Sequence, residues 1–78
     1  MLFRSESAHL RQRFASLTAR EREVLAGLVA GKLNKQIASD LGIALQTVKF
    51  HRTRIMDRVQ ARTVAELMHL TARVGLKA

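Results

Sequence analysis

The residues that could do chemistry in this 78-residue sequence are mostly cations. Fourteen Lys and Arg residues stand against six Asp and Glu, which gives a formal net charge of +8. The segment from Lys32 to Arg62 holds seven of these cations and two acids, whereas residues 18–31 have no net charge. A basic cluster of this kind is typical of proteins that bind a polyanion, above all duplex nucleic acid.

Catalysis and metal binding are not indicated by the titratable residues. No pair suited to acid–base chemistry is found among five of the six acidic residues, Glu21, Glu23, Asp40, Asp57 and Glu66. Two of these five, Glu21 and Glu66, fit helix-capping patterns instead. The three histidines lie far apart in sequence and there is no Cys, so we predict no metal site. We expect His51, at the edge of the core, to be a packing or hydrogen-bonding residue and not a ligand. No Ser-His-Asp set or Gly-rich phosphate loop is present. We therefore predict no enzyme activity and no cofactor.

The elements that must position the cations are predicted to be helices. The sequence has no Pro and only four Gly, and 47% of its residues are hydrophobic, which favours a folded all-α domain. Capping boxes at residues 18–21 and 63–66 predict two helix starts. Gly31 and Gly75 follow as the expected helix ends.

Two further helices are predicted between these. The first runs from Asn34, which we expect to be its N-cap, to Leu41. A turn containing Gly42 leads to the second, at about residues 45–60. Two helices joined by a short turn with Gly form a helix-turn-helix pattern.

The helix at 45–60 has two faces. At 100° per residue, Val48, Ile55 and Val59 share an apolar face that we expect to be buried. The opposite face carries four residues, including an aromatic ring among polar side chains; they are Gln46, Lys49, Phe50 and Thr53.

Three segments of the chain resemble a known family. They are similar in order and spacing to the motifs of the LuxR-type (NarL/FixJ) DNA-binding domain. The three segments are Leu17-Thr18-Ala19-Arg20-Glu21-Arg22-Glu23-Val24-Leu25, Gly31 with Asn34-Lys35-Gln36-Ile37-Ala38, and Thr47-Val48-Lys49-Phe50-His51. The resemblance extends from about Leu17 to Leu76 and is greatest to FixJ-type response regulators. It implies a four-helix LuxR/GerE-type helix-turn-helix domain, the output half of a two-component transcription regulator. Where the family usually has Ser at the start of the recognition helix, this chain has Ala44.

The resemblance and the helical faces together suggest how DNA is bound. We expect base contacts in the major groove from the polar face of the recognition helix, namely Gln46, Lys49, Phe50 and Thr53. We expect contacts to the DNA backbone from Lys35, Thr47, Arg52 and Arg54.

Assembly and context are predicted as follows. The last helix is expected to leave an exposed apolar strip, formed by Leu67, Leu70, Thr71 and Val74, through which the domain dimerises on an inverted-repeat operator.

Residues 1–16 are expected to be a helical linker, with Phe3, Leu10, Phe14 and Leu17 on one face, and residues 17–76 are expected to be the domain. RNA polymerase is a further expected partner. No stretch is long enough for a membrane helix and no signal peptide is present, so we expect no membrane partner and a cytoplasmic protein.

Two alternative functions remain open. A sigma-factor region-four domain shares some of these motifs but predicts a different stretch after the turn than Phe50-His51-Arg52-Thr53-Arg54-Ile55. A helical adaptor would bind a protein partner through the Leu10/Phe14 or Leu67/Val74 faces, and its binding would depend only weakly on salt. The operator, the regulated genes, the activating signal and the presence of an upstream receiver domain are not indicated by this sequence.

Overall fold

A computed structural model describes residues 2–75, with side chains from residue 8 onward. Helices within this part are α1 (Leu2–Ala15), α2 (Ala19–Val29), α3 (Asn34–Leu41), α4 (Leu45–Val59) and α5 (Val64–Arg73), and no strand is present there. The predicted all-α fold, with four helices preceded by an N-terminal helix, is confirmed. The side chain of Phe3 and the expected domain end at Leu76 lie outside the described residues.

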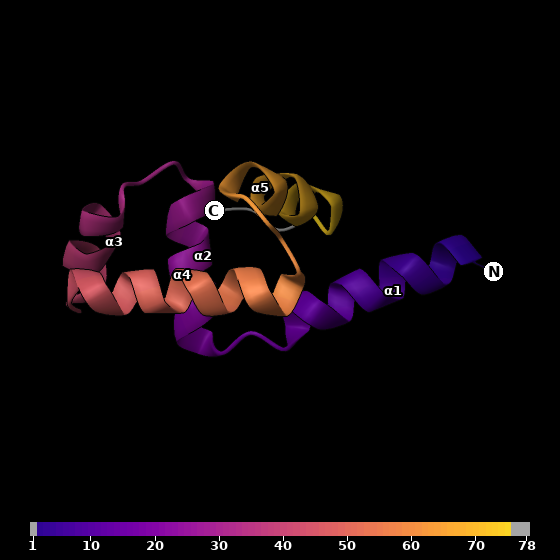
Figure 1. The fold of residues 1–78 in the computed structure, drawn as a ribbon, viewed down its shortest axis with the longest axis horizontal. Coiled ribbons are helices and arrows are strands. Elements are labelled where there is room, and N and C mark those ends of the chain that lie inside the picture. Colours follow the sequence, from indigo (N-terminus) through magenta and orange to yellow (C-terminus); the bar gives the residue numbers. More distant parts are fainter. Residues whose placement is uncertain (1, 76–78) are drawn as a thin grey trace.

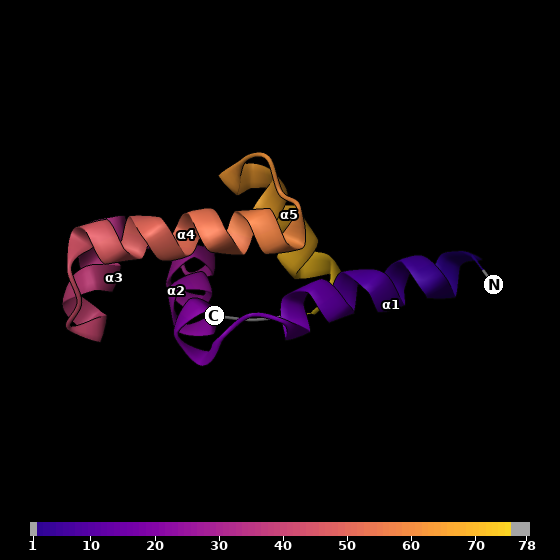
Figure 2. The ribbon, with the colours of Figure 1, turned by 60° about the horizontal axis from the view of Figure 1, so that its bottom comes forward.

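The other helices of the domain are packed around α4 (Figures 1 and 2). Both α2 and α3 pack against it, α5 crosses its C-terminal half, and α1 leaves from that same end and projects away from the others. The core consists of side chains from all five helices; the most completely buried apolar ones are Val24, Ile37, Val48, Ile55, Val59 and Leu67. Among residues 2–75, no helix has the length and apolar character needed to span a membrane.

The predicted capping signals are found at α2 and α5, with one change of partner. The Thr18 hydroxyl accepts the Glu21 N–H at 3.1 Å, and the Glu21 carboxylate accepts the Thr18 N–H at 2.9 Å. At α5, the Thr63 hydroxyl accepts the Glu66 N–H in the same way, but the Glu66 carboxylate accepts the N–H of Arg62. Both helix starts are therefore fixed locally by the sequence.

The prediction that Asn34 is the N-cap of α3 is wrong. Leu33 has the extended backbone of an N-cap, and Asn34 is the first helical residue. The side chain of Gln36 accepts the Leu33 N–H at 2.8 Å and so provides half of a capping box. The Leu33 side chain is 62% exposed.

The C-terminal half of α1 is part of the domain core. Leu10 and Phe14 are buried, together with Leu17 just beyond the helix. The Leu10/Phe14 face, one of the two faces considered for the adaptor alternative, is therefore buried within the domain.

Candidate nucleic-acid interface

The two faces predicted for α4 are found in the structure. Val48, Ile55 and Val59 have no exposed surface, and they attach the helix to α2, α3 and α5. The four side chains expected to contact bases are all exposed and share the opposite face: Gln46, Lys49, Phe50 and Thr53. Since the core holds one side of α4 and leaves the other to solvent, the exposed side can enter a groove without rearrangement of the domain.

Phe50 is an aromatic ring with no place in the core. Its side chain is 57% exposed, the largest exposed apolar surface on α4. The guanidinium carbon of Arg54 lies 5.6 Å from the ring centroid, and the His51 ring centroid lies 5.9 Å away. A cation–π contact at an exposed position is worth only about 0.5–1 kcal/mol, so packing within the domain does not account for a phenylalanine here.

The start of α4 has no side-chain cap. Ala44 is the N-cap and its methyl group cannot accept a hydrogen bond. The Thr47 side chain is half-buried, and the Thr47 N–H donates to the Ala44 carbonyl at 3.0 Å. Further along the helix, the Thr53 hydroxyl donates to the Lys49 carbonyl at 3.1 Å. The Thr53 oxygen keeps its lone pairs, so it remains able to accept a hydrogen bond from a base.

The cations expected at the DNA backbone differ in their surroundings. Lys35 is exposed in the first turn of α3, where helix N–H groups also favour an anion. Arg52 is half-buried on α4. Lys32 has its charge balanced by an ion pair with Asp40. Of these three, Lys35 and Arg52 are therefore better placed than Lys32 to neutralise a phosphate.

Arg54 takes part in an interaction that the sequence analysis did not anticipate. Its Nε atom lies 3.5 Å from one carboxylate oxygen of Glu21, and the Nε of Arg58 lies 3.7 Å from the other. The Arg58 guanidinium also donates to the carbonyl of Ser16 at 2.8 Å. The Arg54 side chain is still about half exposed, so a ligand can reach it while it is ion-paired with Glu21 of α2.

Glu21 is the centre of this interaction, and only 2% of it is exposed. Burial raises the pKa of its carboxyl. The hydrogen bond from the Thr18 N–H and the nearby guanidinium groups of Arg58 and Arg54 together lower the pKa by more than burial raises it, so the net pKa is below the ordinary 4.5. The carboxylate is therefore ionised at neutral pH, where it connects the start of α2 to α4. Sequence reasoning identified Glu21 only as a capping residue, because no local pattern indicates two arginines from a distant helix.

The predicted dimer strip on α5 requires a correction. Leu67 and Thr71 are buried, with 0% and 1% exposed, so they belong to the core and cannot meet a second copy. The Thr71 hydroxyl donates to the Leu67 carbonyl, which satisfies it within the helix. Leu70 and Val74 are half-buried against the core. The prediction assumed that the small core would cover only part of this stripe and leave these residues on the free side, but the core covers Leu67 and Thr71 almost completely.

His51 is half-buried beside the core, as expected for a packing residue. Its Nδ1 atom is buried and has no hydrogen-bond partner among the described residues. Across that same part of the chain, no group of three His, Cys, Asp or Glu side chains is arranged to hold a metal ion.

Comparisons with known proteins agree with this geometry. Residues 15–71 match the family model described as bacterial regulatory proteins, luxR family. The chain is 42% identical over 64 residues to the transcriptional regulatory protein FixJ of Bradyrhizobium diazoefficiens, covering 82% of this chain and 31% of that protein. It is 51% identical over 51 residues to the C4-dicarboxylate transport transcriptional regulatory protein DctR of Rhodobacter capsulatus, covering 65% of this chain and 26% of the relative.

Solved structures show the same similarity. A low-resolution structure of the response regulator StyR superposes with a TM-score of 0.89 at 46% identity, over 92% of this chain and 36% of that one. The crystal structure of full-length FixJ from B. japonicum superposes with a TM-score of 0.80 at 39% identity, over 88% of this chain and 34% of that one. The chain thus spans about a third of the length of these relatives. It belongs to the luxR family of bacterial regulatory proteins and is a helix-turn-helix domain of the kind found in FixJ-type response regulators.

Proposed function

We propose that this domain binds double-stranded DNA sequence-specifically as the output domain of a transcription regulator, with α4 in the major groove. The observation that carries the proposal is the exposed face of α4. Lys49 and Phe50 project from a helix whose opposite face is fully buried, and the domain offers them no internal role. Lys49 is suited to guanine O6 and N7, Phe50 to a thymine methyl, and Gln46 to adenine.

The backbone contacts of this proposal come from both helices of the motif. Lys35, at the start of α3, and Arg52, on α4, act as point contacts to phosphates. Arg54 and Thr47 complete the set, with Arg54 held in position by Glu21. If these three cations and other Lys and Arg side chains of residues 32–62 together neutralise about six phosphates, the plot of log K against log salt concentration has a slope of about −5. A helical adaptor predicts almost no salt dependence.

The proposal is tested by selecting binding sites with two lysine variants. Lys49→Ala is expected to lose about 1–3 kcal/mol on the best site and to relax base preference at one or two positions. Lys35→Ala is expected to weaken all sequences alike and to make the salt slope shallower by about one. Arg73→Ala, measured on a single half-site, serves as a control of equal charge loss on α5. Unchanged base preference in Lys49→Ala would show that α4 does not read the sequence, and a salt slope shallower than about −2 would contradict DNA binding altogether.

We further propose that two copies assemble on an inverted repeat through the side of α5 that carries Val64 and Met68. Val64 is 38% exposed there, and Met68 is half-buried one turn later on the same side. Half-sites about one helical turn of DNA apart, roughly 34 Å, suit a symmetric pair. Val64→Arg is expected to remove cooperativity on the full operator while single half-site binding is unchanged. Cooperative binding by this variant equal to that of the parent would rule out the α5 surface.

Since the chain covers about a third of its relatives, we infer that a receiver domain precedes it in the complete regulator. RNA polymerase is the partner we propose for the DNA-bound form, and the cytoplasm is the compartment that chromosomal DNA binding requires. A phosphoacceptor domain upstream of Met1 in the open reading frame is the observation that tests this inference, and an open reading frame without one would contradict it.

A further inference from the structure

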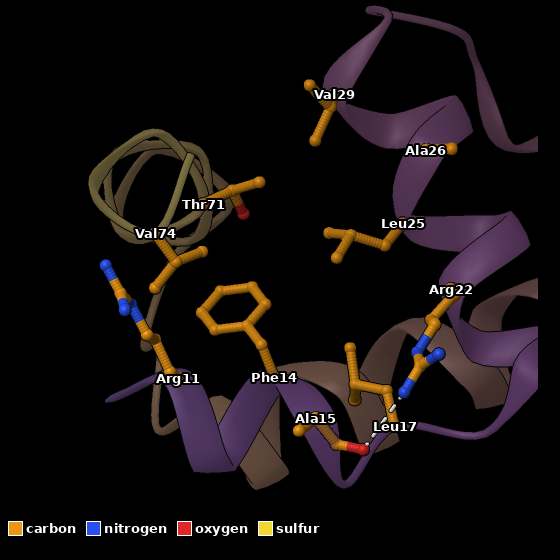
Figure 3. Close-up of a pocket in the computed structure, with 10 residues that line it drawn as sticks. All are labelled: Arg11, Phe14, Ala15, Leu17, Arg22, Leu25, Ala26, Val29, Thr71 and Val74. Atoms are coloured by element: carbon orange, nitrogen blue, oxygen red, sulfur yellow. Dashed lines mark hydrogen bonds between the residues drawn. The ribbon is translucent and has the colours of Figure 1, made fainter. Parts of the chain in front are cut away.

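The domain has a pocket that plays no part in the proposed DNA contacts. It encloses about 360 Å³ between α1, α2 and α5, and none of its described lining residues comes from α4. The Phe14 ring points into the space between the three helices, with Leu25 and Val29 facing it from α2 and Val74 from the end of α5 (Figure 3). Small-molecule sites in proteins enclose about 300–1,000 Å³ and are mainly apolar, so this pocket has the size and lining of a site for a small ligand.

Two cations border the apolar lining. Arg11 and Arg22 are both exposed, and they lie on either side of Phe14 and Leu17 (Figure 3). Among the described residues, no acidic side chain lines the pocket. The pocket therefore combines a buried apolar floor with a solvent edge that is positively charged, which is complementary to an amphipathic anion.

The two arginines are not equally available to a ligand. Arg22 donates through Nη2 to the Ala15 carbonyl at 3.1 Å, which holds its side chain across the turn between α1 and α2. Arg11 makes no hydrogen bond or ion pair with the side chains described for this chain. Its planar guanidinium is suited to a two-point contact with a carboxylate. Arg11 is consequently the residue expected to receive the anionic group, with Arg22 contributing positive potential.

We propose that this pocket binds a small amphipathic carboxylate, such as a medium-chain fatty acid. The alkyl chain packs against Phe14, Leu25 and Val74, and the carboxylate pairs with Arg11. Because the walls come from three helices, the bound ligand connects the linker helix α1 to α2 and α5 and stabilises the folded domain. The volume is too small for a helix of a protein partner, which favours a small molecule.

The proposal is tested by titrating the 78-residue chain with octanoate in the absence of DNA, observed by methyl NMR. We expect saturable shifts at the methyl groups of Leu25, Val29 and Val74, with a Kd on the order of 1 mM or below. The uncharged analogue 1-octanol is expected to bind at least several-fold more weakly, because it cannot pair with Arg11. The melting temperature should rise with octanoate concentration.

Three variants separate the pocket from general binding to a basic protein. Arg11→Met is expected to lose the preference for octanoate over octanol, whereas Arg20→Met, an equal loss of charge outside the pocket, is expected to keep it. Ala26→Leu places a larger side chain in the pocket and should weaken both ligands. Circular dichroism checks the fold of each variant, and because Arg11 is exposed its variant remains informative even if Ala26→Leu unfolds.

Three results would overturn the proposal. These are equal affinity for octanoate and octanol, an equal loss in Arg11→Met and Arg20→Met, and shifts concentrated on the Lys49 face of α4. Failure here leaves DNA binding untouched, because the titration contains no DNA and Arg11→Met is expected to bind the operator as the parent does.

Discussion

Glu21 offers a test of how the recognition helix is held in place. Its carboxylate accepts the Thr18 N–H and lies within 3.7 Å of both Arg54 and Arg58. A hydrogen bond to a charged group contributes about 1.5–3 kcal/mol. The two ion pairs add less than a buried pair would, because Arg54 and Arg58 are 47% and 31% exposed and water screens them. We expect Glu21→Ala to lower the free energy of unfolding by about 2–4 kcal/mol.

The more informative variant is Glu21→Gln. The amide oxygen can still accept the Thr18 N–H, so the change removes mainly the charge, and we expect a loss of about 1–2 kcal/mol. For a domain of this size, that lowers the melting temperature by roughly 5–15 °C. The matched control is Glu23→Gln, an exposed carboxylate 3.5 Å from Arg20, for which we expect a loss below about 0.5 kcal/mol.

The dependence on pH gives an independent signature. The pKa of Glu21 is lower in the folded protein than the ordinary 4.5. The ionised carboxylate therefore contributes its full stabilisation at any pH above the pKa that Glu21 has in the unfolded chain. That contribution is lost as the pH falls through the folded pKa. Urea denaturation of the parent and of Glu21→Gln at about pH 7 and about pH 3 measures the difference, which should shrink as the pH is lowered. Equal stability of the Glu21→Gln and Glu23→Gln variants at neutral pH, or a difference that does not change with pH, would refute the reasoning.

Three further predictions concern single positions. Ala44→Ser should add the missing cap to α4 and stabilise the domain by about 0.5–2 kcal/mol, measured by denaturation; no gain would mean that the first turn is already satisfied. Gly27→Ala should destabilise by about 1–3 kcal/mol despite the better helix propensity of Ala, because the new Cβ would lie 2.7 Å from Cγ1 of buried Ile37; equal or greater stability in the same assay would show that Ile37 can move. Leu67→Ala should lower the free energy of unfolding by about 2–5 kcal/mol, whereas Val64→Ala should lower it by less than about 1 kcal/mol. Similar losses for the two variants in thermal unfolding would contradict the burial of Leu67 and the exposure of Val64.

The helices were predictable because their signals are local. Thr18 and Thr63 are each followed three residues later by Glu, and this is sufficient to define a helix start. The exposed face of α4 was predictable for the same reason, since the 3.6-residue period separates Val48 and Ile55 from Lys49 without knowledge of the neighbours.

What the sequence did not reveal depends on contacts between distant helices. The sequence predicted an apolar stripe on α5 that is partly free, because the sequence does not show how much of the stripe the core covers; Leu67 and Thr71 are buried. The start of α3 was assigned to Asn34 on residue preference, whereas the side chain of Gln36 caps the Leu33 N–H instead. The interaction of Glu21 with two arginines on α4 was missed because it forms only when α2 packs against α4.

The central claim, that α4 reads bases in the major groove, is tested most directly by intermolecular nuclear Overhauser effects in a complex with a selected duplex. Phe50 is the best reporter, because its ring is 57% exposed and its predicted target is a thymine methyl. We predict contacts between the Phe50 ring protons and one thymine methyl, together with contacts from the Lys49 side chain to a guanine one or two base pairs away. A complex in which both side chains contact only solvent or sugar–phosphate protons, while another helix faces the bases, would contradict the account.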